Sequence, residues 1–345
     1  MSEFSKISWT DSTFNPWIGC TKVSPGCANC YAEEMDRKRF SKTLPGCSLE
    51  APKTHWGKGA PRYRTKTWGE PVKWDQYWAV FQQVDMQDGT RHRGDMKQIA
   101  ALALDADKIV ACGPVRRRVF CSSLADWLDD EVPAEWLADL LEVVCSTPSL
   151  DWLLLTKRPG GWHLRMEAAQ KVLEGRTSAP ASRAFIDVDY WLHGSAPANV
   201  WIGTTVENQD YAERRIPELL KIPAKVRFLS VEPMLGPVDL SKILVNHKLA
   251  WFVNNHRGGL LASAMSNTMG SMPWIDWVIC GGESGTGRRP FEIEWAESLA
   301  AQCATAGVAF FMKQDAHAKS GQQGRLPAAL WSIKQFPVSR TKTHA

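Results

Sequence analysis

The sequence predicts an α/β protein built on a parallel (β/α) barrel, partial or full, with loop-rich insertions. Three observations predict this fold class. From residue 115 onward, short apolar runs alternate with helical stretches, which indicates βαβ units. The runs are continuously apolar, as in strands that a parallel sheet buries on both faces. The length of 345 residues suits a single TIM-like barrel with insertions.

Six apolar runs are the predicted strands of this barrel. They are Val119–Cys121, Trp152–Leu155, Val200–Gly203, Val226–Leu229, Trp277–Cys280 and Val308–Met312. A further short strand is predicted near Ile7–Trp9, ahead of the first cysteines. A doubly wound open sheet is the alternative. It is disfavoured because no Gly-x-Gly-x-x-Gly follows the first strand.

Helices are predicted between these strands and in the N-terminal part. The ranges are Tyr31–Phe40, Met96–Ile109, Pro133–Val144, Gln209–Leu220 and Glu292–Ala304. The clearest is Pro133–Val144, where the apolar residues share one face and Pro133 suits a first turn.

We expect residues 1–345 to form one barrel domain. It would have an N-terminal cluster-binding loop at 10–35 and insertions near 85–112, 176–198 and 240–272. The first residues contain no apolar stretch, and no run approaches the roughly 18 apolar residues that a membrane span needs. We therefore expect a cytoplasmic protein without a membrane partner.

Three cysteines within eleven residues, Cys20, Cys27 and Cys30, are the most informative motif. Cysteines this close in a reducing compartment are usually metal ligands. Gly19 and Gly26 each precede one of them and let the backbone approach a metal. Three ligands without a fourth in the loop predict a metal centre with an open coordination position.

Two metals fit this C-x6-C-x2-C spacing. Thiolates suit both a [4Fe–4S] cluster and zinc. A structural zinc site needs a fourth ligand, for which Cys47 and His55 are the candidates. A cluster held by three thiolates leaves one iron open, and this is the interpretation we favour.

Polar or small residues follow the predicted strands where each one ends. Those singled out as candidate ligands are Lys157, Glu207, Glu232, Gly281, Gly282, Glu283 and Lys313. Carboxyl ends of parallel strands meet at one mouth, where barrel enzymes carry their sites. A carboxylate there suits a ribose hydroxyl or a cofactor amine, and a lysine suits a carboxylate or phosphate. Structural salt bridges are the alternative role for each of them.

Charge and aromatic content indicate a nucleic-acid or nucleotide partner. The net charge is only +4, but basic residues cluster at Arg37–Arg39, Arg62–Lys66 and Arg116–Arg118, and the chain has 17 tryptophans. Cations and aromatic rings together suit single-stranded nucleic acid, whether DNA or RNA. Solvated surface charge and core tryptophan are the alternative.

Several segments resemble an uncharacterised phage and bacterial family defined by a three-cysteine motif. They are Ser8–Asp11, Asn15–Cys20, Lys22–Glu33, Leu155–Pro159, Val200–Asn208, Arg227–Pro233 and Gly281–Gly285. The resemblance covers nearly the whole chain except the insertions, and it implies a phage or bacterial origin without a known reaction.

More distantly, the arrangement resembles radical S-adenosylmethionine enzymes, which carry three cysteines after the first strand of a partial barrel. That resemblance implies a [4Fe–4S] cluster on Cys20, Cys27 and Cys30, S-adenosylmethionine on the open iron, and an electron donor. It also implies that Gly281–Glu283 holds the amino group of the cofactor. Here the first cysteine gap is six residues rather than three, Asn29 replaces an aromatic residue, and the Gly-Gly-Glu follows a late strand.

The favoured function is therefore generation of a 5′-deoxyadenosyl radical for hydrogen abstraction, with a nucleic-acid base or nucleotide as substrate. Two alternatives stay open. One is a nucleic-acid-binding phage protein stabilised by zinc, without radical chemistry. The other is an iron–sulfur barrel that hydrolyses or transfers groups without radicals.

Overall fold

The structure is a computed structural model that describes residues 3–44, 47, 53–245, 248–249 and 274–337. The chain forms two compact units. Unit 1 comprises Met1–Thr21, Ala32–Leu154 and His163–Trp201, and unit 2 comprises Lys22–Tyr31, Leu155–Trp162 and Ile202–Ala345. Strands β8 (Leu150–Thr156) and β9 (Val200–Thr205) each have residues in both units.

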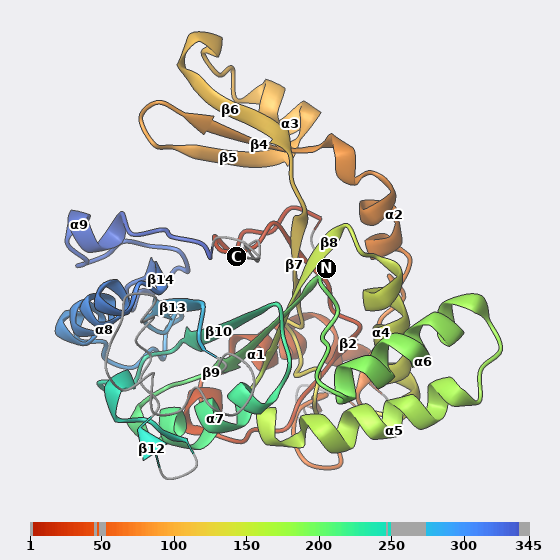
Figure 1. Cartoon of the computed structure of the whole chain (residues 1–345). Coiled ribbons are helices and arrows are strands. Elements are labelled where there is room, and N and C mark those ends of the chain that lie inside the picture. Colours follow the sequence, from red (N-terminus) through yellow and green to blue (C-terminus); the bar gives the residue numbers. More distant parts are fainter. Residues whose placement is uncertain (1–2, 45–46, 48–52, 246–247, 250–273, 338–345) are drawn as a thin grey trace. The chain divides into compact units, whose positions relative to one another are not determined.

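The main sheet has seven strands in the order β1-β7-β8-β9-β10-β13-β14 (Figure 1). Besides β8 and β9, its members are β1 (Ser12–Thr13), β7 (Arg117–Cys121), β10 (Val226–Val231), β13 (Trp277–Gly281) and β14 (Ala309–Gln314). The pairing is parallel, with Ser12 opposite Val119, Phe228 opposite Trp277, and Trp277 opposite Ala309. Because β1 and β14 are its two edge strands, the curled sheet is a partial barrel. The predicted fold class is confirmed.

Burial explains why these six apolar runs become strands. Every residue of β7, β9 and β13 is buried, as expected for parallel strands covered on both faces. The large side chains of Trp152, Phe228 and Trp277 are fully buried. Each such side chain contributes about 1.5–3 kcal/mol or more by leaving water.

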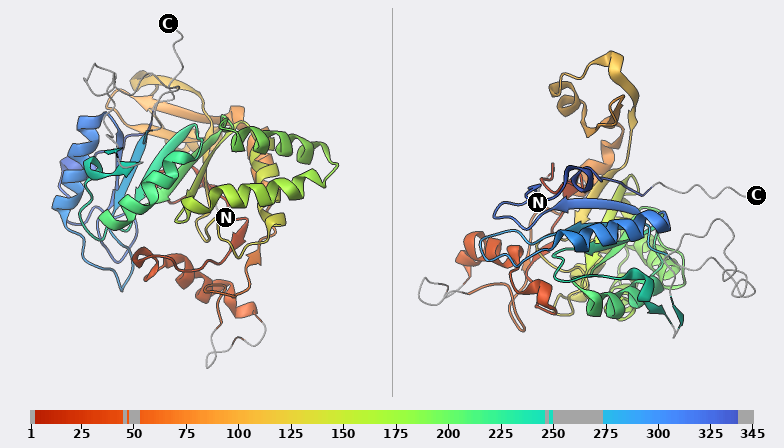
Figure 2. Two further views of the ribbon diagram at one scale, coloured as in Figure 1. Left: turned by 60° about the horizontal axis from the view of Figure 1, so that its bottom comes forward. Right: turned by 90° about the vertical axis from the view of Figure 1, so that its left-hand side faces the viewer.

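Three of the predicted helices form, with bounds close to those expected from the sequence, and they pack on the main sheet. They are α4 (Ala134–Ser146), α7 (Gln209–Lys221) and α8 (Ile293–Ala306), and α8 contacts β13 and β14 (Figure 2). Asn208 caps α7 by accepting a hydrogen bond from the Tyr211 amide. Gly307 ends α8 in the left-handed conformation, where a side chain would be strained.

The predicted strand at Ile7–Trp9 is wrong, since these residues form a bend and turn. The first strand is Ser12–Thr13, two polar residues with no apolar signal. Trp9 is buried because its ring packs on Phe120 at 4.6 Å, as a core side chain rather than a strand residue.

The predicted insertion at 85–112 lies within a three-stranded antiparallel sheet of unit 1, in the order β5-β4-β6, that spans Phe81–Pro114. Its strands are β4 (Phe81–Met86), β5 (Arg91–Asp95) and β6 (Ile109–Pro114). The helix predicted over Met96–Ile109 is therefore too long. Helix α3 (Met96–Ala101) begins with an Asp95 capping box and ends before the chain enters β6.

The range 176–198 is helical rather than loop-rich. It contains α6 (Ala179–Leu192), capped by Ser178, which runs beside α5 (Trp162–Glu174) (Figures 1 and 2). Most of the predicted insertion at 240–272 lies outside the described residues. Its described part holds η6 (Leu240–Lys242), β11 (Leu244–Val245) and β12 (Lys248–Leu249).

Short elements complete the described chain. They are β2 (Trp17–Ile18), η1 (Pro25–Cys27), α1 (Tyr31–Arg39), η2 (Ser41–Thr43), β3 (Tyr63–Arg64), α2 (Glu70–Gln76), η3 (Trp78–Val80), η4 (Ala106–Lys108), η5 (Pro159–Gly161) and α9 (Ala328–Trp331). Helix α1 agrees with the range predicted directly after Cys30.

Candidate functional site at the cysteine loop

The segment Ser24–Cys30, called here the cysteine segment, belongs to unit 2 and carries Cys27 and Cys30. Cys27 ends η1 and is buried, and its Sγ lies 3.6 Å from the Ser24 hydroxyl. Ser24 in turn donates a hydrogen bond to the carboxylate of Glu207. A Cβ on Gly26 would overlap with the same carboxylate, so only glycine allows this approach.

Glu207 stands just beyond the carboxyl end of β9 and is fully buried. Its charge is compensated by Arg215 on α7, whose Nη1 lies 2.8 Å from Oε2. The same guanidinium donates to the Thr205 carbonyl, which fixes it against the strand end. Arg215 of α7 therefore binds Oε2 of Glu207, while Oε1 accepts the hydrogen bond from Ser24 in the cysteine segment.

Glu283 performs a similar task after β13. Its Oε2 accepts hydrogen bonds from Asn29 Nδ2 at 3.0 Å and from Arg289 Nε at 3.0 Å. Arg289 Nη1 also donates to the Pro25 carbonyl, and Asn29 donates to the Gly287 carbonyl. Burial would raise the pKa of Glu283, but the hydrogen bonds from Arg289 and Asn29 outweigh it and lower that pKa. The carboxylate is thus ionised and holds the cysteine segment on a second side.

Gly281 and Gly282 stand where the backbone is tightly packed. A Cβ on Gly281 would meet the Glu232 carboxylate at 2.9 Å, and one on Gly282 would overlap with the backbone of Ala316. The Gly282 carbonyl also accepts from Gln314 Nε2 at 2.8 Å. Close packing thus explains both glycines, while the ligand role predicted for Gly281–Glu283 stays a prediction.

Glu232 follows β10 and is paired with a lysine. Its Oε1 lies 2.9 Å from Lys313 Nζ at the end of β14. Lys157, after β8, donates to Thr205 Oγ1 at 3.2 Å. The strand ends of unit 2 thus carry both carboxylates and lysines, as the sequence predicts.

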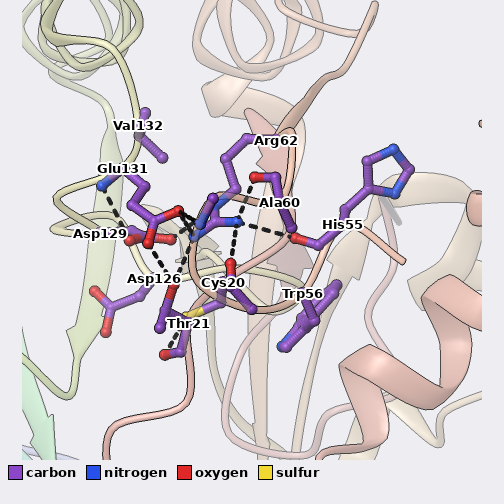
Figure 3. A network of polar contacts seen from close by, with 12 residues as sticks. Cys20, Thr21, His55, Trp56, Ala60, Arg62, Asp126, Asp129, Glu131 and Val132 are labelled. Carbon is purple, nitrogen blue, oxygen red and sulfur yellow. Dashed lines mark hydrogen bonds and ion pairs between the residues drawn. The ribbon is translucent and has the colours of Figure 1, made fainter. Parts of the chain in front are cut away.

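Cys20 belongs to unit 1, where a buried arginine holds its neighbourhood (Figure 3). Arg62 pairs with Asp129 at 2.9 Å and donates to the Thr21 hydroxyl at 2.8 Å. The Cys20 carbonyl accepts from the Gly57 amide at 3.0 Å, and Arg62 donates to the Gly57 carbonyl. Arg62, Asp129 and their neighbours therefore fix the start of the cysteine loop.

His55, a candidate fourth zinc ligand, has one ring nitrogen engaged. Its Nδ1 lies 2.7 Å from Asp36 Oδ1, and both side chains are buried, so Nε2 is the nitrogen left for a metal. Figure 3 shows the His55 ring turned away from Cys20 while the His55 carbonyl meets Arg62. The Cys47 sulfur accepts a hydrogen bond from the Lys53 amide at 3.4 Å.

All nine cysteines are free thiols, and Cys20 and Cys30 are partly exposed while Cys27 is buried. Across the described ranges, no group of three His, Cys, Asp or Glu side chains stands ready to hold a metal ion. Ligation by Cys20, Cys27 and Cys30 therefore stays a prediction, supported by the donor chemistry of three thiols that are close in sequence.

Part of the predicted nucleic-acid surface is interior, while the cluster Arg37–Arg39 is exposed. The side chains of Arg62, Arg117 and Arg118 are buried and paired with carboxylates. Among the described tryptophans, those most deeply buried are Trp9, Trp17, Trp127, Trp152, Trp191 and Trp277. For these residues the alternative, a core role, is correct.

Several residues of the site carry no sequence signal of their own. Ser24, Arg215 and Arg289 contact partners that only the fold brings near. Asn29 did stand out, because it replaces the aromatic residue usual before the third cysteine, and its amide proves to bind Glu283. The polar side chain at position 29 was therefore the one sequence feature that could have indicated this contact.

Together, these observations define an α/β protein with a partial parallel barrel, in which the segment bearing Cys27 and Cys30 is bonded to residues that follow β9 and β13. The chain belongs to the family described as "Protein of unknown function (DUF5131)", whose model matches residues 4–332. No curated protein and no solved structure matches the chain. Within the described residues, no helix is long and apolar enough to cross a membrane.

Proposed function

We propose that the chain is an iron–sulfur enzyme of the radical S-adenosylmethionine type. Cys20, Cys27 and Cys30 would hold a [4Fe–4S] cluster. One observation carries the proposal: within unit 2, the segment bearing Cys27 and Cys30 is hydrogen-bonded to Glu207 and Glu283, which follow the carboxyl ends of β9 and β13. Barrel enzymes carry their chemistry at this end of the strands.

The donor set fits such a cluster. Three thiols in one loop supply soft sulfur ligands, and the glycines beside them permit close backbone approach. When bound and reduced by an electron donor, the cluster would supply the one electron needed to cleave S-adenosylmethionine to methionine and the 5′-deoxyadenosyl radical, which would abstract hydrogen from the substrate.

The protein's own groups would bind and orient the cofactor. Glu232 supplies a carboxylate after β10, which suits an ammonium group or a ribose hydroxyl. Lys157 and Lys313 supply cations at the ends of β8 and β14, and a lysine there suits the cofactor carboxylate. Glu207 and Glu283 act on this account as positioning residues for the cysteine segment.

The test is cleavage of S-adenosylmethionine by anaerobically prepared protein under reduction. We expect 5′-deoxyadenosine to form with the native chain and to be undetectable with Cys27→Ser. Cys112→Ser, an exposed thiol on β6, is the matched control and should retain activity. Absence of 5′-deoxyadenosine from native protein with an intact cluster would overturn the radical reaction and leave an iron–sulfur protein of another activity.

Glu232→Gln separates binding from folding in the same assay. We expect its KM for S-adenosylmethionine to rise about tenfold or more, since a charge-assisted hydrogen bond is lost. Glu292→Gln, an exposed carboxylate at the start of α8, is the control and should leave KM unchanged.

Substrate class and cellular location belong to the same proposal. We propose a nucleotide or nucleic-acid base as substrate, an electron donor as partner, and action in the cytoplasm of a bacterial cell or a phage-infected host. A zinc-stabilised nucleic-acid-binding protein remains the alternative.

A further inference from the structure

An open pocket in unit 2 is lined by three arginines. Its volume is about 390 Å³, within the range of small-ligand sites. The lining residues come from the loop after β13 and from the segment after β14: Arg288, Arg289, Pro290, Phe291, Ala316 and Arg325. Pro290 and Ala316 add apolar surface to the cationic wall.

The three arginines of the pocket differ in their ion pairing. Arg289 pairs with Glu283 at 2.6 Å, and Arg325 pairs with Asp315 at 2.9 Å and also interacts with Glu292 and Glu294. Arg288 is exposed and has no carboxylate partner among the described residues, and its Nη1 donates only to the Gly285 carbonyl at 3.3 Å. The Arg288 guanidinium is therefore the one whose donors are most open to an anionic ligand.

Two of the guanidinium groups are already fixed in place. Arg289 makes two bonds to Glu283 and one to the Pro25 carbonyl. Arg325 makes two bonds to Asp315 and one to the Phe291 carbonyl. Each guanidinium has five N–H donors, so donors remain after these bonds. A preorganised guanidinium loses less conformational entropy when it binds a phosphate.

The pocket adjoins the cysteine segment. Arg289 bonds the Pro25 carbonyl, and Asn29 bonds the Gly287 carbonyl next to Arg288. A ligand held by these arginines would lie beside the segment that carries Cys27 and Cys30.

We propose that this pocket binds the phosphate group of a nucleotide, with Arg288 as the arginine that no carboxylate among the described residues engages. The pocket takes a phosphate whether the nucleotide is free or part of a single strand. This inference deepens the substrate class of the proposed function, but it rests on the pocket itself and holds whether or not the cysteines bind a cluster.

The experiment measures fluorescence anisotropy of a labelled single-stranded DNA of about twelve nucleotides, with the full-length protein. AMP and inorganic phosphate serve as competitors. We expect Arg288→Gln to weaken DNA binding, or AMP competition, about tenfold, and to reduce the salt slope by about one. Arg214→Gln, an exposed arginine of α7 in the same unit, is the charge-matched control and should change affinity less than about twofold.

The competitors tell the two phosphate sources apart. If AMP displaces the DNA, the pocket accepts a free nucleotide. If only the strand binds, and does so through Arg288, the phosphate belongs to nucleic acid. The proposal is overturned if neither probe binds the native protein, or if Arg288→Gln and Arg214→Gln bind both probes equally. None of these results depends on iron, so failure here is distinct from failure of the radical reaction.

Discussion

In unit 1 the chain at Cys20 and Thr21 is held by a buried arginine, whereas in unit 2 the cysteine segment is held by carboxylates. Arg62 is almost completely buried and bonds Asp129, the Thr21 hydroxyl and nearby carbonyls. Glu207 and Glu283 instead follow two strands of the main sheet and bond Ser24 and Asn29.

This difference in the groups that hold the chain indicates that the unit 1 network serves stability and the unit 2 contacts serve the candidate site. The unit 1 network satisfies its own charges, so its removal should affect stability first. In unit 2 the residues that hold the cysteine segment follow strand ends, as do Glu232 and Lys157, the candidate ligands. Changes there should alter the reactivity of the cysteines more than the stability of the fold.

The largest expected effect comes from Arg62→Met. This substitution leaves Asp129 buried without its partner, which should lower the free energy of unfolding by about 3–5 kcal/mol. Urea denaturation measures the loss. Arg183→Met, which breaks an exposed pair with Asp187 on α6, should have a much smaller effect on the free energy of unfolding. Equal stability of the two variants would contradict the role given to the unit 1 network.

A smaller effect is expected from Gly26→Ala, which tests whether Glu207 positions the cysteine segment in unit 2. The added Cβ overlaps with the Glu207 carboxylate and should cost about 1–3 kcal/mol locally. We expect alkylation of the buried Cys27 thiol in metal-free protein to quicken by about tenfold or more, measured by mass spectrometry. Gly161→Ala, with open space around it, is the control. Equal alkylation rates would show that Glu207 does not position the segment.

The smallest effect is expected from Glu283→Gln, and it depends on pH. The hydrogen bonds from Arg289 and Asn29 lower the pKa of Glu283, so its stabilisation is fully present above the ordinary glutamate pKa of about 4.3. It is lost as pH falls through the lowered value. Near pH 7 the variant should be about 1–2 kcal/mol less stable. In acid, the two unfolding curves should converge.

Glu292→Gln, whose carboxylate is exposed, should follow native protein at every pH. A pH-independent gap between Glu283→Gln and native protein would mean that the charge of Glu283 contributes nothing.

The sequence predicts the main sheet well because its strands are continuously buried. Runs such as Trp152–Leu155 and Trp277–Cys280 have no polar residue to confuse their assignment. Ser12–Thr13 is different, since two polar residues become a strand only through pairing with β7. The β4–β6 sheet also escapes prediction because its exposed strands, such as Arg91–Asp95, are polar. The local pattern of apolar residues cannot identify a strand that forms only because it pairs with another strand.

The site was predictable in its residue types but not in its contacts. Position after a strand identified Glu207, Glu232 and Glu283 from sequence. Their partners could not be found this way, because Ser24 and Asn29 lie far away along the chain. For Arg62 the sequence-based interpretation was wrong. Its place in a basic cluster indicated contact with nucleic acid, but the fold buries its side chain against Asp129.

The most direct test of the central claim is the iron, acid-labile sulfide and zinc content of anaerobically purified protein. The account predicts about four irons and four sulfides per chain, lost in Cys27→Ser and kept in Cys112→Ser. One zinc per chain without sulfide would contradict it.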